Sequence, residues 1–280
     1  MDLVFLMTLC YNGVRQKIMK RGIKMKIGII GTGTIASAIV TGFCTQQTGH
    51  EFYVSPRNAE KAAELAAKFS EVTVCSSNQD VLGRADWIFI TVQKNGFDAV
   101  YELNFRPDHK VINMATEMQL DELKEKIGET AVFAHAVPLP MIVGGYGPFL
   151  VHPETPEIGE LFKPVGDVLY IENIEDIKTL QIFTCMMSPY YMLMQEMVQF
   201  SVDHGVEHDV SVKFAHSLFS SLTRRAAEDM PHHDLIELAH DMTPGGYNEQ
   251  AMNELMENGA IKAWRTILDT LLVRLEAAKK

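Results

Sequence analysis

A glycine-rich hexapeptide, Gly31–Ala36, limits the possible folds of this chain more than any other segment. It has the sequence Gly-Thr-Gly-Thr-Ile-Ala and follows the apolar run 26–30, which predicts a strand. Helical spacing of apolar residues begins directly after it, at 35–43. Glycine at the first position permits a tight turn, and glycine at the third lets the backbone approach a ligand. A strand, such a turn and a helix together predict that the pyrophosphate of a dinucleotide binds at the helix N-terminus.

Strands and helices alternate from residue 25 to about residue 136. Apolar runs that predict strands recur at steps of about 20–25 residues, with helical patterns between several of them. This alternation is typical of a parallel sheet with helices on both faces. The predicted strands are 26–30, 51–54, 72–75, 86–92, 110–113 and 131–136.

The pattern changes near residue 175, where strand signals fade and helical periodicity takes over. One helix is expected over 177–200, and another after Thr243-Pro244-Gly245-Gly246, with Thr243 as N-cap and Pro244 in the first turn. The fold class is therefore α/β: a Rossmann-type dinucleotide-binding domain at 25–174, followed by an all-α substrate and dimerisation domain at 175–280. The apolar surface of 177–200 predicts burial against a second subunit.

Residues 1–24 differ in character from the rest, with five basic residues and one acidic residue. We expect them to be an N-terminal appendage, with Met25 as the natural start; a weak targeting segment is the alternative. The whole chain has a formal charge of −11, which argues against a nucleic-acid partner. No apolar run approaches the ~18 residues of a membrane span, so no membrane partner is expected. The spacing of the four cysteines suits free thiols and a cytoplasmic location.

The end of the second predicted strand distinguishes between nicotinamide cofactors. It carries Ser55, Arg57 and Asn58 where a carboxylate would bind the ribose hydroxyls of NAD. These three side chains can donate hydrogen bonds to a 2′-phosphate, which favours NADP, with NAD as the alternative. A solvated Arg57 and a capping Ser55 would be the purely structural interpretation. The expected cofactor contacts are Gly31, Thr32, Gly33, Thr34, Ile35, Ala36, Ser55, Arg57, Asn58, Val92, Gln93 and Lys94.

Over roughly residues 25–278 the chain resembles the pyrroline-5-carboxylate reductase family. The resemblance rests on the segments 25–39, 55–61 and 85–92, and on Thr243-Pro244-Gly245-Gly246, which is similar to the family's Ser/Thr-Pro-Gly-Gly motif. It implies reduction of the cyclic imine Δ1-pyrroline-5-carboxylate to proline by NAD(P)H, hence a role in proline biosynthesis. It also implies a homodimer built through the C-terminal helices, which can assemble into a higher oligomer.

The substrate side departs from the family's pattern. The family has a hydroxyl-bearing Thr after Pro-Gly-Gly, and this chain has Tyr247-Asn248. The family's Ser-Gly-Ser-Gly-Pro-Ala is represented by 185–190, which keeps Ser188 and Pro189 and has no glycine. Asn248, Tyr247 and Ser188 are the catalytic candidates; Tyr247 could instead pack on a neighbouring subunit, and Ser188 could cap a helix. The expected substrate contacts are Ser188, Pro189, Thr243, Gly245, Gly246, Tyr247 and Asn248.

Two other functions stay open on the sequence. A β-hydroxyacid dehydrogenase would use a lysine in the first helix of the second domain, but the helix expected at 177–200 has none after Lys178. A non-catalytic NADP-binding regulator would explain the changed substrate motifs. His204 and His208 have zinc-like i, i+4 spacing, but Gly205 lies between them and no third ligand is evident, so no metal is expected.

Overall fold

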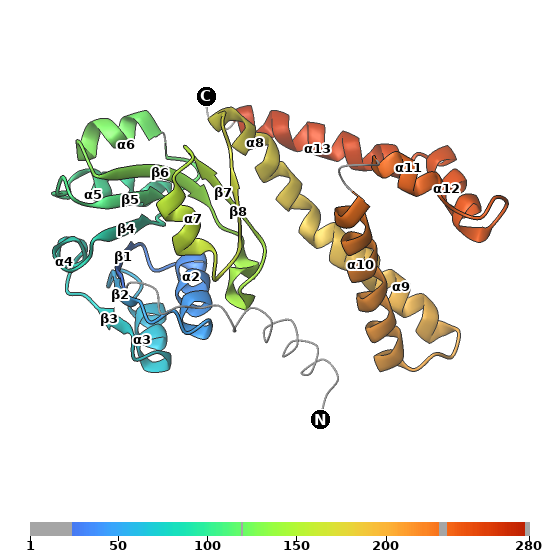
Figure 1. The fold of residues 1–280 in the computed structure, drawn as a ribbon, viewed down its shortest axis with the longest axis horizontal. Coiled ribbons are helices and arrows are strands. Elements are labelled where there is room, and N and C mark those ends of the chain that lie inside the picture. The colour runs from blue at the N-terminus through green and yellow to red at the C-terminus, as the bar shows by residue number, and fades with distance from the viewer. Residues whose placement is uncertain (1–23, 119, 230–233, 278–280) are drawn as a thin grey trace. The chain divides into compact units, whose positions relative to one another are not determined.

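The computed structural model describes residues 24–118, 120–229 and 234–277. The chain divides into two compact units, Met1–Ile174 and Glu175–Lys280. Strands and helices alternate in the first unit, and the described part of the second unit contains helices alone (Figure 1). The predicted class, a Rossmann-type α/β domain followed by an all-α domain, is confirmed.

An eight-stranded sheet forms the centre of the first unit, in the order β3-β2-β1-β4-β5-β6-β7-β8. From β3 to β6 all neighbours are parallel; β7 is antiparallel to β6 and parallel to β8. Since β1 lies between β2 and β4, the winding reverses there, and ligands of such sheets bind outside the carboxyl ends at that point. The strands are β1 (Lys26–Ile30), β2 (Glu51–Val54), β3 (Val72–Val74), β4 (Trp87–Ile90), β5 (Lys110–Asn113), β6 (Val132–Val137), β7 (Pro148–His152) and β8 (Asp167–Tyr170).

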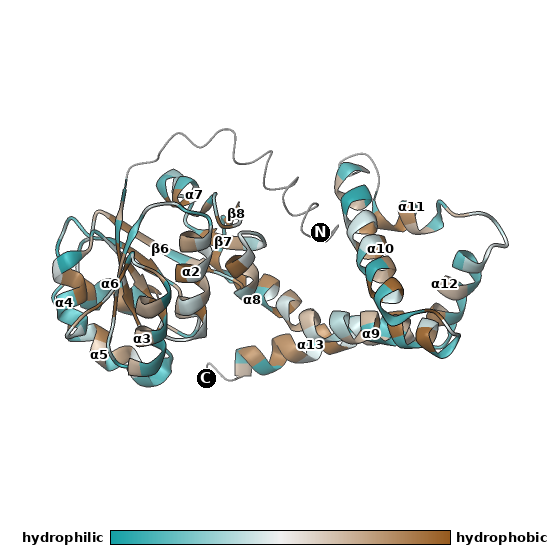
Figure 2. Cartoon of the chain, turned by 90° about the horizontal axis from the view of Figure 1, so that it is seen from below, coloured by the Kyte–Doolittle hydropathy of each residue, from teal (hydrophilic) through white to brown (hydrophobic). Residues whose placement is uncertain are grey.

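Helices bury the sheet on both faces. On β4, Trp87 and Phe89 belong to one core cluster, which includes residues of α2, α3 and α7. Ile88 and Ile90 belong to the other, with residues of α4, α5 and α6. Because its side chains alternate between the two core clusters, β4 is buried on both faces, which explains why it is apolar throughout. Figure 2 shows hydrophobic residues in strands and helices alike. The helices are α2 (Thr34–Thr45), α3 (Ala59–Lys68), α4 (Asn78–Arg84), α5 (Phe97–Tyr101), α6 (Leu120–Ile127) and α7 (Pro156–Phe162), with short 3-10 helices η2 (Lys94–Gly96) and η3 (Pro140–Gly144).

Phe162, at the end of α7, is the centre of an aromatic cluster. Its ring centroid lies 4.0 Å from that of Phe149, 5.4 Å from Phe43 and 5.5 Å from Phe89. All four rings are fully buried. Helix α7 and the strands β7 and β8 were not expected from the sequence, because these elements are short and no regular apolar period marks them.

The second unit contains six helices in its described part. The single helix expected over 177–200 is wrong: α8 ends at Phe183, a 3-10 turn follows, and α9 starts at Met187. Pro189 is the third residue of α9, where its missing N–H costs no intrahelical hydrogen bond. The helices are α8 (Ile174–Phe183), α9 (Met187–Asp203), α10 (His208–Asp229), α11 (Leu235–His240), α12 (Tyr247–Glu257) and α13 (Ala260–Ala277), with the 3-10 helix η4 (Thr184–Met186).

The helix start predicted at Thr243 is also wrong. Thr243–Gly246 forms a turn closed by the Gly246 N–H, which donates to Thr243 O at 2.9 Å. Gly245 has a φ of 72°, which is incompatible with a right-handed helix. Helix α12 therefore begins at Tyr247, with Gly246 as N-cap. In the described part of the chain, no helix has the length and apolar content to cross a membrane.

Candidate functional site

The glycine turn joins β1 to α2 at the carboxyl edge of the sheet. Gly31 has a φ of 102°, and the Gly33 N–H donates to Gly31 O at 3.0 Å. A methyl group on Gly31 would lie 2.8 Å from Val92 Cγ1 and 3.0 Å from the Val92 nitrogen. Both the backbone angle and the close approach of the segment after β4 therefore require glycine at this position.

Gly33 serves a different purpose, because a methyl group there would meet nothing within 4 Å. It is the N-cap of α2, and the first paired amide of this helix is Ser37 N–H, which donates to Gly33 O at 3.0 Å. The preceding amides, at Thr34, Ile35 and Ala36, have no partner within the helix. An open backbone with unpaired N–H groups at the positive end of a helix suits a phosphate.

Ser55, directly after β2, holds this turn in place. Its hydroxyl accepts the Gly31 N–H at 2.9 Å, and the Thr32 hydroxyl donates to the Ser55 carbonyl at 2.7 Å. The Ser55 side chain is fully buried, and the two hydroxyls lie 3.2 Å apart. Ser55 thus acts on the glycine turn, and its hydroxyl does not face the cavity as a 2′-phosphate donor would.

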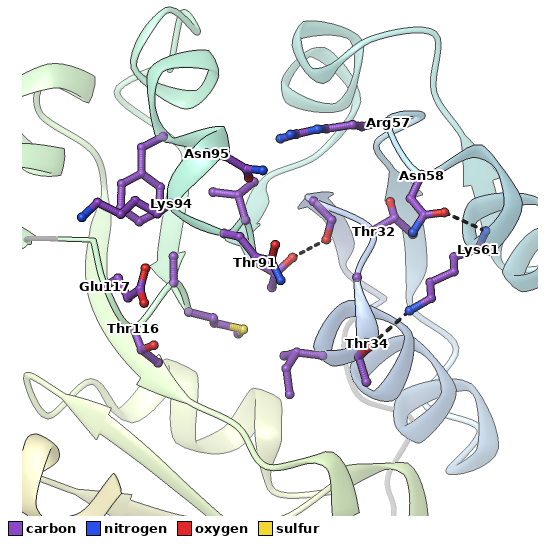
Figure 3. A pocket seen from close by; sticks show the side chains of 18 of the residues that line it. Thr32, Thr34, Arg57, Asn58, Lys61, Thr91, Lys94, Asn95, Thr116 and Glu117 are labelled. Carbon is purple, nitrogen blue, oxygen red and sulfur yellow. Dashed lines mark hydrogen bonds between the residues drawn. The ribbon is translucent and has the colours of Figure 1, made fainter. Parts of the chain in front are cut away.

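A cavity of about 1180 Å³ follows the carboxyl ends of β2, β1, β4 and β5 (Figure 3). That volume is ample for a large cofactor. All the residues that line it come from the first unit: Gly31, Thr32, Gly33, Thr34, Ile35, Arg57, Asn58, Ala59, Glu60, Lys61, Thr91, Val92, Gln93, Lys94, Asn95, Phe97, Met114, Ala115, Thr116 and Glu117.

The β2 end of the cavity is rich in hydrogen-bond donors. Asn58 caps α3 by accepting the Lys61 N–H at 3.3 Å, and the Lys61 ammonium donates to the Thr34 hydroxyl at 3.2 Å. Arg57 starts at the same end and points toward Asn95 in Figure 3, and a methyl group on Gly96, after β4, would lie 2.8 Å from its Nη1. Lys61 was not among the predicted contacts. Its place three residues after the N-cap Asn58, on the face of α3 next to α2, could have indicated it.

The other end of the cavity is built by the segments after β4 and β5. The Thr91 hydroxyl donates to Gly31 O at 2.5 Å and so fixes the β4 segment against the glycine turn. Val92, Gln93 and Lys94 follow it in the chain and line the cavity, and their contact with a cofactor stays a prediction. Met114–Glu117, after β5, also line the cavity and were missed, because nothing in their sequence differs from an ordinary loop.

Most of the predicted cofactor contacts line this single cavity, and two do not. Ala36 is fully buried in the first turn of α2, where its small side chain allows the helix to approach the sheet. Ser55 lies beneath the turn, as described above. These two residues act through packing and hydrogen bonding, while contact with a cofactor stays a prediction for the others.

The predicted substrate residues all lie in the second unit. Ser188 and Pro189 are in the first turn of α9, and Tyr247 and Asn248 open α12. The Tyr247 side chain is 89% exposed. In the turn before α12, the Gly245 N–H donates to Glu249 Oε2 at 2.5 Å, so a carboxylate of the chain itself occupies that amide. Their role in substrate binding stays a prediction.

Histidine and cysteine side chains are the candidates for metal or thiol chemistry among the described residues. No group of three or more potential ligands is placed to hold a metal ion there. His204 caps the end of α9 and His208 begins α10, so the two do not share a helix face. Burial raises the pKa of the Cys44 thiol to about 12 and that of Cys75 to about 11, so both are protonated and unreactive at neutral pH.

A protein family and a curated relative each match part of this chain. Residues 26–117 match the family described as NADP oxidoreductase coenzyme F420-dependent. ComE operon protein 4 of Bacillus subtilis (strain 168) is 24% identical over 111 residues, which are 37% of this chain and 40% of that protein. The matched segment thus spans well under half of this curated relative.

Solved structures match nearly the whole chain. The 1-pyrroline-5-carboxylate reductase of Streptococcus pyogenes has a TM-score of 0.75 at 19% identity, with 91% of this chain and 99% of that chain covered. The Plasmodium falciparum pyrroline carboxylate reductase, solved with NADP bound, has a TM-score of 0.75 at 14% identity, with 91% of this chain and 98% of that chain covered.

Every residue that lines the cavity falls inside the segment 26–117 that matches the oxidoreductase family. The structural matches extend over both units and confirm the fold that the sequence resemblance implies. This chain has the fold of the pyrroline-5-carboxylate reductases.

Proposed function

We propose that this chain is an NADPH-dependent reductase of a cyclic imine, which converts pyrroline-5-carboxylate, or a close analogue, to proline or the matching cyclic amine. The observation that carries the proposal is the cavity, which joins a phosphate-binding turn to donor side chains at one end and to β4 and β5 at the other. The fold shared with pyrroline-5-carboxylate reductases supports the same reaction class.

The residues present fit a nicotinamide dinucleotide. Gly33 leaves room for a pyrophosphate beside the unpaired amides of α2. When bound, the nicotinamide supplies the hydride, and the protein orients the two reactants. Val92, Gln93 and Lys94 would hold the nicotinamide ribose by lining the β4 side of the cavity. Orientation of this kind lowers a reaction barrier by several kcal/mol.

We propose NADP as the cofactor, because the segment between β2 and α3 carries Arg57 and Asn58 and has no carboxylate. The relative from Plasmodium falciparum, which binds NADP, supports this choice. An Arg57→Ala variant is expected to lose affinity for NADPH at least tenfold and to keep its affinity for NADH, since only NADPH has the phosphate. Equal losses for both cofactors would refute the assignment.

The decisive experiment measures loss of NADPH absorbance with a panel of pyrroline-5-carboxylate, pyrroline-2-carboxylate and piperideine carboxylates. Turnover on at least one of them is expected. If NADPH binds and no imine is reduced, the enzyme assignment fails and the non-catalytic regulator is supported. On the substrate side we keep Ser188, Tyr247 and Asn248 as the residues to substitute first.

We further propose a homodimer through the C-terminal helices. Phe200 on α9 and Phe214 on α10 are 65% and 69% exposed, and Figure 2 shows further hydrophobic residues along α13. Large exposed apolar side chains gathered in one unit are typical of an interface. Light scattering coupled to gel filtration should give twice the mass of the chain, and Phe214→Glu should reduce it. The free thiols Cys44 and Cys75 support a cytoplasmic location.

A further inference from the structure

The turn after β5 presents one acidic side chain to the cavity. Buried Asn113 accepts the Ala115 N–H at 3.0 Å, and the Met118 N–H donates to Ala115 O at 3.1 Å. Ala115 and Met118 are both 4% exposed. With both ends of the turn anchored in the core, the two central residues, Thr116 and Glu117, face outward and line the cavity.

Glu117 lies far from the phosphate-binding donors. The strand order puts the ends of β2 and β5 three strand spacings apart, about 14 Å. Figure 3 shows Glu117 on the same side of the cavity as Thr116 and Lys94, opposite Arg57 and Lys61. Because the adenosine half of a dinucleotide lies on the β2 side, the β5 side receives the nicotinamide and the substrate.

Only two acidic side chains line the cavity within the described residues, Glu60 at the β2 end and Glu117 at the β5 end. A carboxylate next to the reacting carbon attracts a cation. An imine becomes such a cation when its nitrogen is protonated. Hydride then adds to the carbon, the π pair moves to nitrogen as a lone pair, and the products are a neutral amine and NADP⁺.

We propose that the Glu117 carboxylate contacts the ring nitrogen of the substrate and selects its protonated form. This inference rests on the proposed function and adds a residue that determines substrate charge. A hydrogen bond from a cationic N–H to a carboxylate is stronger than one between neutral groups. Because the contact exists in the bound substrate before hydride transfer, loss of Glu117 raises KM and leaves kcat little changed.

The test uses two five-membered rings that differ in one atom. Pyrrolidine-2-carboxylate carries a cationic nitrogen at neutral pH, and tetrahydrofuran-2-carboxylate has an ether oxygen in its place. Calorimetry on the NADP⁺-saturated full-length protein gives the Kd of each ring. The wild type should prefer the cationic ring, and Glu117→Gln should reduce that preference about tenfold. Glu117→Asp should restore part of it.

The matched control is Glu60→Gln, which removes the acid at the other end of the cavity and should leave the preference unchanged. The Kd of NADP⁺ should be the same in Glu117→Gln and the wild type. The inference would be overturned if Glu117→Gln kept the preference for the cationic ring, or lost affinity equally for both rings. It would also be overturned if this variant lost affinity for NADP⁺ in parallel, or if the wild type bound neither ring. A Glu117-dependent preference in a wild type that reduces no imine would support this inference and refute the proposed reaction.

Discussion

Substitution of Ser55 by alanine distinguishes two roles of its hydroxyl: support of the glycine turn and contact with a 2′-phosphate. In the structure the Ser55 hydroxyl is fully buried and accepts the Gly31 N–H at 2.9 Å. Alanine leaves that amide without its partner, a loss of about 1–3 kcal/mol. At about 2 kcal/mol the melting temperature of a unit of this size falls by roughly 4–8 °C. Because the turn itself is loosened, NADPH and NADH should both bind more weakly, and by the same factor.

Differential scanning calorimetry and titrations with both cofactors measure these effects. Ser37→Ala is the matched control: its hydroxyl donates to Gly33 O at 3.0 Å, an oxygen that also accepts the Ser37 N–H. That oxygen keeps one bond, so the control should lose about 0.5 kcal/mol or less. If Ser55→Ala keeps its melting temperature, or loses affinity for NADPH alone, Ser55 is a ligand of the 2′-phosphate and the present interpretation is refuted.

Three further predictions follow from backbone geometry, packing and titration. Gly31→Ala should lower both the melting temperature and the affinity for NADPH, because Gly31 has a φ of 102°. Gly33→Ala places its methyl group in open space, so it should lower the affinity for NADPH and leave the melting temperature unchanged. Equal melting temperatures of the two variants would contradict this prediction. Phe162→Ala removes the central ring of the aromatic cluster and should lower the free energy of unfolding, measured in urea, by about 3–5 kcal/mol. A loss below about 1 kcal/mol would contradict this prediction. Burial, aided by the charge of Arg106, lowers the pKa of His109 from its ordinary 6.5. The neutral, buried imidazole therefore contributes its full free energy of stabilisation to the folded state above pH 6.5. That contribution is lost as the pH falls from 6.5 through the lowered pKa of the folded state. His109→Gln should therefore weaken the decline of urea stability between about pH 7 and pH 5, and an identical decline would exclude His109 as a source.

The sequence predicted best where local pattern and tertiary position agree. β4 is apolar on both faces because both core clusters cover it, so its run of apolar residues could be interpreted without a structure. The turn at Gly31 was equally readable, since a strand, glycines and a helix occur in direct succession.

Features that depend on a distant partner could not be worked out from the sequence. Ser55 had the right residue type for a phosphate contact, but its hydroxyl is already bonded to Gly31, 24 residues earlier in the chain. The break at Thr184–Met186 lies inside an apolar stretch whose period continues on both sides, so hydropathy could not reveal it. Glu117 reaches the cavity only because β5 pairs with β4, a contact that composition does not encode.

The bond from the Thr91 hydroxyl to Gly31 O joins residues 60 positions apart. Such parallel pairing forms late in folding, since a long loop must close before any contact compensates for the lost chain entropy. In a nascent or partly unfolded chain, the segment after β4 is therefore not yet joined to the glycine turn, and the cavity is incomplete. NADPH should bind only to the completed α/β unit. Bound cofactor is then expected to slow proteolysis and unfolding in proportion to its concentration, without accelerating refolding. In a cell, a larger supply of cofactor would thus lengthen the lifetime of each finished molecule.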